Sequence, residues 1–98
     1  MKLVGHVRPA LLEMERATGW YEAHQDGLGT RFKNAIAEAE AFVSRNPEAG
    51  VPYRAGTRKW RVRGFPYAII YRNEPERIIV IAVAHASREP GYWLDRLP

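Results

Sequence analysis

Five basic side chains lie within ten residues, with no acidic residue among them: Arg54, Arg58, Lys59, Arg61 and Arg63. If residues 58–64 form a β-strand, Lys59, Arg61 and Arg63 project from one side at a spacing of about 7 Å, twice the rise per residue. Phosphates along a nucleic-acid strand have a similar spacing, and each cation can neutralise one phosphate. The pattern therefore predicts a face that binds nucleic acid or another target. The alternative is a strand face whose cations only keep the protein soluble.

A second group of residues with chemical potential follows the most apolar part of the chain: His85, Arg88, Tyr92 and Trp93. A histidine, an arginine and a tyrosine at the end of a sheet can supply acid–base chemistry and stabilise a phosphate. The alternatives are structural. His85 would then be a hydrogen-bonding residue at a strand end, and Tyr92 and Trp93 would cap the edge of a core.

Several other kinds of chemistry are excluded or disfavoured by composition. The chain has no cysteine, which excludes a disulfide scaffold, a thiol nucleophile and any cysteine-ligated metal. We expect no metal site, because no two histidines have the short spacing typical of zinc ligands: His6, His24 and His85. The Gly27-Leu28-Gly29 sequence does not follow a strand pattern, so it is not a phosphate-binding loop.

The positive charge of the chain is concentrated in its C-terminal half. The 98 residues are enough for a single domain, residues 1–98. Residues 1–9 carry a charge of +2, residues 10–50 carry −3 and residues 51–98 carry +5, which gives the net charge of +4. This asymmetry suggests a polyanion or an acidic protein as partner. No apolar stretch is typical of a signal peptide or a membrane span, so we expect a cytoplasmic protein.

Two amphipathic helices are expected to occupy the N-terminal half. Pro9 suits the first turn of a helix, and apolar residues then recur at helical spacing as far as Tyr21. After a break at Gly27–Gly29, a second apolar series has spacings of three and four residues: Leu28, Phe32, Ala35, Ala39, Phe42 and Val43. Asn46-Pro47 ends this helix. The turn between the two is short, so they should form an antiparallel hairpin.

The residue types change to those of strands after Tyr53. We expect strands over residues 58–64, 67–71 and 78–84, with turns at Phe65-Pro66 and at residues 73–76. Residues 3–7 are a candidate N-terminal strand, and residues 89–97 a candidate short C-terminal helix. The fold class is therefore α+β, with a two-helix hairpin packed on one face of a small, antiparallel-rich β-sheet.

Short motifs occur in a specific order along nearly the whole chain. The helical half contains Trp20-Tyr21, then Gly27-Leu28-Gly29, then NPEAG at residues 46–50. The strand half contains these further motifs: Phe65-Pro66-Tyr67, Tyr71, His85, Arg88, Pro90 and Tyr92-Trp93. Together they resemble the RelE/ParE toxin superfamily, and the strand half resembles it more closely.

This resemblance implies a toxin of a type II toxin–antitoxin system, the kind that serves plasmid stabilization. Such toxins have two helices on a small sheet and are encoded beside an antitoxin, which typically wraps the toxin with an acidic, amphipathic segment. The implied partner is a cognate antitoxin, the implied assembly is a dimer or a toxin–antitoxin heterotetramer, and no cofactor is implied. ParE-like members poison DNA gyrase, whereas RelE-like members cut messenger RNA on the ribosome.

RelE-type cleavage uses a cluster of cations, and the resemblance allows several to be located here. Lys59 and Arg61 match the paired lysines of RelE, and Arg88 matches a later arginine. Tyr92 is near, but not on, the position of the RelE tyrosine. Ala68 stands where RelE has another arginine, and an alanine cannot bind phosphate. That departure favours the ParE-like branch.

Three functions therefore stay open, and a growth-inhibiting toxin that binds DNA gyrase is favoured. The alternative is a ribosome-dependent endoribonuclease, so enzymatic activity is uncertain, with this catalytic set: Lys59, Arg61, His85, Arg88 and Tyr92. A further alternative is a non-toxic module that binds nucleic acid. For a binding function, the predicted contact residues are Arg54, Arg58, Lys59, Arg61, Arg63, Arg88 and Trp93.

Overall fold

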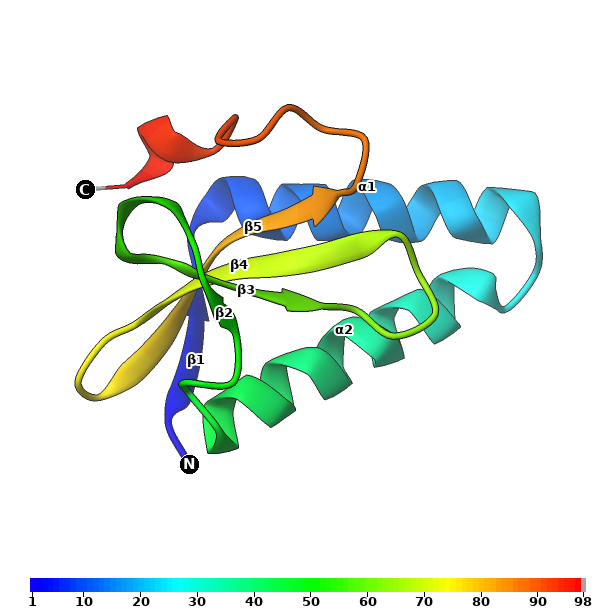
Figure 1. The fold of residues 1–98 in the computed structure, drawn as a ribbon. Coiled ribbons are helices and arrows are strands. Elements are labelled where there is room, and N and C mark those ends of the chain that lie inside the picture. The colour runs from blue at the N-terminus through cyan, green and yellow to red at the C-terminus, as the bar shows by residue number, and fades with distance from the viewer. Residues whose placement is uncertain (98) are drawn as a thin grey trace.

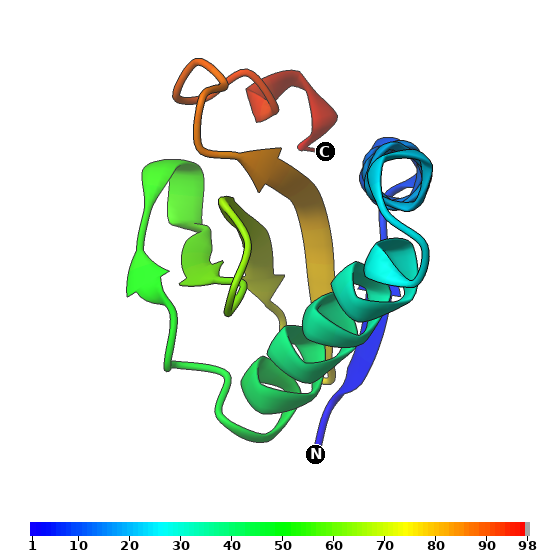
Figure 2. The ribbon, with the colours of Figure 1, turned by 90° about the vertical axis from the view of Figure 1, so that its right-hand side faces the viewer.

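The computed structural model describes residues 1–97, which form two helices and a five-stranded sheet. The elements in chain order are β1 Leu3–His6, α1 Arg8–His24, α2 Leu28–Arg45, β2 Val51–Pro52, β3 Arg58–Arg61, β4 Tyr67–Asn73 and β5 Arg77–His85. Two short 3-10 turns complete them, at Arg54–Gly56 and Leu94–Arg96. Both helices lie on one side of the sheet, as Figures 1 and 2 show. The predicted α+β class is confirmed.

The helical hairpin has the predicted boundaries, and its turn depends on one carboxylate. Gly27 adopts a left-handed conformation with φ of 86° and cannot cap α2 with a side chain of its own. The Glu22 carboxylate of α1 instead accepts the backbone N–H groups of Gly27 and Gly29, each at 3.0 Å. The helices approach closely at Gly29, because a Cβ there would lie 2.8 Å from the Thr18 carbonyl oxygen.

The sheet is mixed, and its strands run in the order β1-β5-β4-β3-β2. The predicted N-terminal strand exists and pairs parallel with β5, while every other pair is antiparallel. The predicted strand over residues 58–64 is shorter than expected. It ends at Arg61, because the chain turns at Arg63-Gly64 and Gly64 takes a φ of 84°. The predicted C-terminal helix is a single 3-10 turn, Leu94–Arg96.

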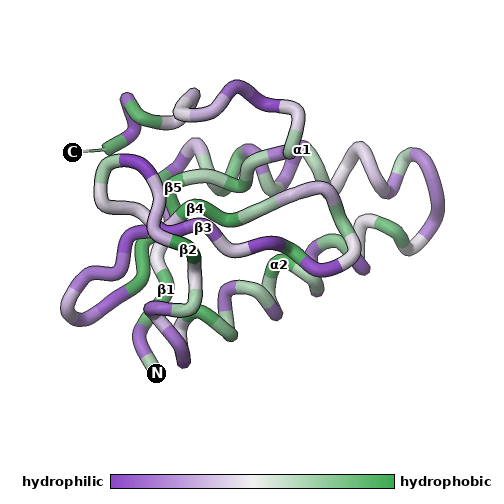
Figure 3. Tube along the Cα trace, viewed as in Figure 1, coloured by the Kyte–Doolittle hydropathy of each residue, from purple (hydrophilic) through white to green (hydrophobic). Residues whose placement is uncertain are grey.

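Each face of the sheet is covered by a separate apolar core. The first core lies under the helices and joins Phe32, Ile36 and Val43 to Ile69 and Val80. The second lies on the opposite face, where the buried Trp93 packs with Ile70, Ile81 and Ala82. A bulge between β4 and β5 brings the consecutive residues Ile81 and Ala82 into the same core. Most of β5 and the middle of β4 are accordingly apolar, as the hydropathy colouring of Figure 3 shows.

Candidate functional site

A groove of about 280 Å³ lies on the sheet face opposite the helices. Its floor follows the strand register: Arg61 of β3 pairs with Ala68 of β4, and Ala68 pairs with Ala84 of β5. The next row along is Lys59, Ile70 and Ala82. Lys59, Arg61, His85, Arg88 and Tyr92 all line this groove. The five residues that the sequence offered as a catalytic set therefore share one surface, which we call the basic groove.

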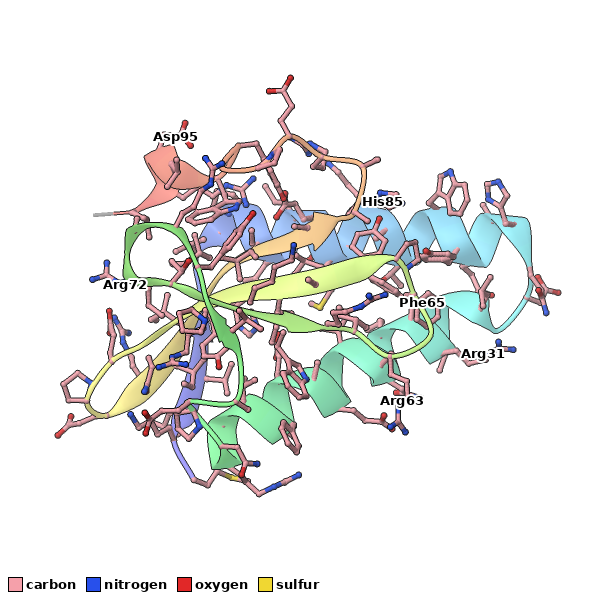
Figure 4. All side chains as sticks on the ribbon, in the orientation of Figure 1. Arg31, Arg63, Phe65, Arg72, His85 and Asp95 are labelled. Atoms are coloured by element: carbon pink, nitrogen blue, oxygen red, sulfur yellow. The ribbon has the colours of Figure 1, made fainter. Side chains whose placement is uncertain are left out.

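The other predicted contact residues lie elsewhere. Arg63 follows the end of β3 and does not line the basic groove, but lines a second cavity beside α2, where Figure 4 labels it. The strand alternation behind the expected common face stops at Arg61, and Arg63 shares the cavity beside α2 with Arg61 but none of the basic groove with Lys59. Arg54 is exposed in the first 3-10 turn.

Arg58 and Trp93 have structural contacts in place of open surfaces. The Arg58 guanidinium donates hydrogen bonds to the carbonyl oxygens of Glu48 and Gly50, at 3.1 and 2.9 Å. It thereby holds the loop that follows α2. Trp93 is only 2% exposed and fills the second core. Its position agrees with the alternative that it caps a core, and it offers little surface to a partner.

Tyr92 is held by Glu13 of α1. Its hydroxyl donates a 2.6 Å hydrogen bond to Glu13 Oε2, while the Arg88 guanidinium stacks 3.8 Å from the centre of its ring. Burial and the neighbouring carboxylate raise the pKa of Tyr92 well above its ordinary value. The hydroxyl is therefore neutral and already engaged. The ring positions Arg88 at the rim of the basic groove.

Glu13 itself is a structural residue that the sequence reasoning missed. It accepts the Val83 N–H at 3.0 Å and two hydrogen bonds from the Arg96 guanidinium, at 2.8 and 3.0 Å. Arg96 also donates to the Ile81 carbonyl oxygen at 3.1 Å. Glu13 and Arg96 thus hydrogen-bond to groups on the edge of β5 that β1 does not reach. Their ion pair also holds the C-terminal segment against α1. A signal was present, because Glu13 stands three residues after Ala10 and four before Ala17, on the apolar stripe of α1.

His85 ends β5 and its ring is fixed by the following turn. Its Nδ1 accepts the Ser87 N–H at 2.9 Å, and the ring meets Tyr67 edge-on with centres 5.0 Å apart. A neutral His85 consequently carries its proton on Nε2. The strand-end hydrogen bond matches the structural alternative for this residue, although the ring also lines the basic groove (Figure 4).

Neither a metal centre nor a membrane-spanning helix is found in the described chain. Residues 1–97 contain no group of three or more histidine, aspartate or glutamate side chains placed to hold a metal ion. Within the same residues, neither helix has the length and apolar character needed to cross a bilayer.

The two-helix hairpin on a five-stranded sheet is the architecture of the RelE/ParE superfamily. Comparisons with known proteins identify the family within this superfamily. A family model described as the ParE toxin of type II toxin–antitoxin system, parDE, matches residues 8–90, so the chain belongs to the ParE toxin family. A solved structure described as the chromosomal ParDE toxin–antitoxin system from P. aeruginosa is similar, with a TM-score of 0.73 and 18% identity. The match covers 87% of this chain and 96% of that one, and at this identity it shows a shared fold. No curated protein gave a significant match.

Proposed function

We propose that this ParE-type toxin inhibits growth by binding DNA gyrase, and that a cognate antitoxin neutralises it. The observation that carries the proposal is the row Arg61, Ala68 and Ala84 across the floor of the basic groove. RelE-like toxins have an arginine at the position of Ala68. Here that position offers a methyl group and is 5% exposed. The groove keeps cations that recognise an acidic surface and lacks one that RNA cleavage of the RelE type uses.

The state of the candidate acid–base groups supports the same proposal. A hydroxyl that donates to a buried carboxylate, as Tyr92 does to Glu13, is a poor proton carrier for a reacting phosphate. The imidazole of His85 has one nitrogen occupied by the Ser87 N–H, which leaves a single nitrogen for any proton transfer. Arg61 and Arg88, by contrast, have no acidic side-chain partner among residues 1–97. They are suited to bind acidic groups of a partner.

A RelE-like endoribonuclease is the second candidate, because all five of its proposed residues line the groove. Lys59, Arg61 and Arg88 could stabilise the charge of a pentavalent phosphate, with His85 nearby. The bond formed would join the 2′-oxygen to phosphorus, and the bond broken would release the 5′-oxygen of the next nucleotide. This candidate requires Ala68 to be tolerated at the floor of the site.

The two candidates are separated by pulse-labelling after tightly controlled induction in bacteria. The gyrase proposal predicts that DNA synthesis falls within the first minutes while protein synthesis continues, and that purified toxin inhibits supercoiling by gyrase. An early collapse of protein synthesis, with supercoiling untouched, would reject the proposal in favour of the ribonuclease. If the protein is not toxic and binds nucleic acid, the third function, a non-toxic module that binds nucleic acid, would be favoured.

Variants of the basic groove test whether its cations recognise the target. We expect Arg61→Ala and Arg88→Ala each to weaken gyrase inhibition about tenfold, the loss typical of one interface arginine. Arg31→Ala is a matched control, because Arg31 is an exposed cation of α2 and lines none of the cavities beside the basic groove. Circular dichroism checks that all three variants fold. Full activity in both groove variants would show that recognition lies elsewhere.

A further inference from the structure

The basic groove continues past the end of the sheet into a second cavity. This cavity encloses about 560 Å³ between α1 and the segment that follows β5. The two hollows share Tyr67, His85, Arg88 and Tyr92 as lining residues. The two hollows therefore adjoin at these side chains, and together they extend from Lys59 and Arg61 of β3 to Arg16 and Trp20 of α1. We call the two adjoining hollows the trench.

Trp20 forms a fixed aromatic platform at the far end of the trench. Its side chain is 57% exposed, which is costly for an indole that could be buried. One ring face is covered by His24, with ring centres 3.8 Å apart and an angle of 28° between the planes. The His24 ring is itself anchored, because Nδ1 lies 2.7 Å from the Trp20 carbonyl oxygen. The indole also lines the trench, so a planar ligand group has a rigid surface on which to stack.

The charge along the trench is positive at both ends and in the middle. Arg16 stands beside Trp20, Arg88 is common to both cavities, and Lys59 and Arg61 line the sheet end. The acid in the α1 cavity, Glu13, is satisfied by Arg96, Tyr92 and the Val83 N–H. Glu89 is the acidic residue that lines the sheet end. Four cations thus face the trench with one uncompensated carboxylate among its lining residues.

We infer that the trench binds single-stranded nucleic acid. One base stacks on the indole of Trp20, its flanking phosphates meet Arg16 and Arg88, and the strand continues over the sheet towards Arg61 and Lys59. Stacking platforms interleaved with cations are the usual means of binding single strands without reading their sequence. A free mononucleotide would leave the sheet end unused, and a purely acidic peptide has no planar group to stack on the indole. The inference concerns nucleic acid alone and stands whether or not gyrase is the target.

The test is fluorescence anisotropy of the purified toxin with a labelled oligothymidylate of eight nucleotides. We expect Trp20→Leu to weaken binding about 5- to 150-fold, the range for loss of one stacked base. Its matched control is Phe42→Leu, an exposed aromatic of α2 that lies outside the trench and stacks on Trp60. We expect Arg16→Gln to reduce the slope of log affinity against log salt by about 0.7, the value for one phosphate on a single strand. Its control, Arg31→Gln, should leave that slope unchanged.

Several outcomes would overturn the inference. Undetectable binding, full affinity in Trp20→Leu, or an equal loss in Phe42→Leu would show that the indole is not a stacking platform. Equal changes of the salt slope in Arg16→Gln and Arg31→Gln would show that the binding is general charge attraction and not specific to the trench. Displacement of the oligonucleotide by an equal nucleotide concentration of thymidine monophosphate would indicate a mononucleotide pocket. Displacement by polyglutamate, equally well from wild type and Trp20→Leu, would indicate a groove for acidic peptides.

Discussion

At the scale of single residues, Glu13 connects parts of the chain that are far apart in sequence. Its carboxylate is 15% exposed and accepts hydrogen bonds from β5, Tyr92 and Arg96. We expect Glu13→Ala to lower the free energy of unfolding by about 1–3 kcal/mol, because the variant leaves the half-buried donors of Tyr92 and Arg96 without this acceptor. Urea denaturation measures this loss. Glu15→Ala, at an exposed position of the same helix, should stay within about 0.5 kcal/mol of wild type. Equal effects in the two variants would contradict the role given to Glu13.

The cations of the basic groove could be predicted from the sequence, whereas their supports could not. Lys59 and Arg61 alternate along a predicted strand, and Arg88 follows another. The resemblance to RelE joined these residues into one set, and the strand order β5-β4-β3 brings them to one groove. The partner of Tyr92 is 79 residues away on a helix that precedes the whole sheet. No local pattern relates the two positions. Charge alternation also failed at Arg63, because the length of β3 is set by the turn at Gly64 and not by the residue types within it.

At the scale of elements, we expect Gly→Ala substitutions at two positions of the helical hairpin to change stability in opposite directions. A methyl group at Gly29 would lie 2.8 Å from the Thr18 carbonyl oxygen and 2.9 Å from Glu22, so Gly29→Ala should destabilise the protein by about 1–3 kcal/mol. Gly19 lies within α1 with open space around it, so Gly19→Ala should stabilise by about 0.5–1 kcal/mol. Thermal unfolding of both variants measures the difference. Stabilisation by both substitutions would show that helix propensity, and not close approach, determines the outcome.

The contact between β1 and α2 makes stability depend on pH. His6 Nε2 lies 2.7 Å from Glu40 Oε2, and this hydrogen bond raises the pKa of His6 above its ordinary value of 6.5, despite opposition from burial. A raised pKa means that protonation of His6 favours the folded state. The contribution is therefore complete below about pH 6.5 and disappears as the pH rises through the folded pKa. Glu40→Gln should abolish this part of the pH dependence.

Urea titrations at pH 6 and pH 8 test the His6–Glu40 contact. Wild type should lose stability between these two values relative to Glu40→Gln. Glu38→Gln is a suitable control, because Glu38 is an exposed residue of the same helix with no ion pair among residues 1–97. A wild-type curve parallel to that of Glu40→Gln would show that the contact does not couple protonation to folding.

The helices and central strands could be predicted because burial imposes a regular pattern of apolar residues on each of them. That pattern is clear in this chain. The series from Leu28 to Val43 and the run from Ile78 to Ala84 both show it. The two-residue strand β2 and the 3-10 turn after it have no such periodicity. Their positions depend on Tyr71, whose hydroxyl accepts the Gly50 N–H and donates to the Pro47 carbonyl oxygen. This tyrosine is fully buried, and its hydrogen bonds to a distant loop have no signature in the sequence.

At the scale of the whole molecule, the two cores share one sheet and should unfold together. Ile69 belongs to the first core and its neighbour Ile70 to the second, so loss of either face disrupts β4 for both. We expect a single cooperative transition in urea, with coincident curves from far-ultraviolet circular dichroism and tryptophan fluorescence. Trp60 contacts the first core and Trp93 fills the second, so fluorescence reports on both. An earlier fluorescence change would show that side-chain packing in at least one core is lost before the sheet unfolds, which would contradict a single transition.

The side chains that bind the edge of β5 also have a consequence for self-association. The segment from Ile78 to Ala84 has seven apolar residues, neither charge nor proline, and high β-propensity, a composition typical of sequences that form amyloid. β1 covers only the first part of its outer edge, and beyond Val80 the Glu13 carboxylate and the Arg96 guanidinium occupy the Val83 N–H and the Ile81 carbonyl oxygen. A strand from another copy finds these groups already taken. The same ion pair that secures the C-terminus therefore protects the native protein against fibre growth from its most vulnerable strand.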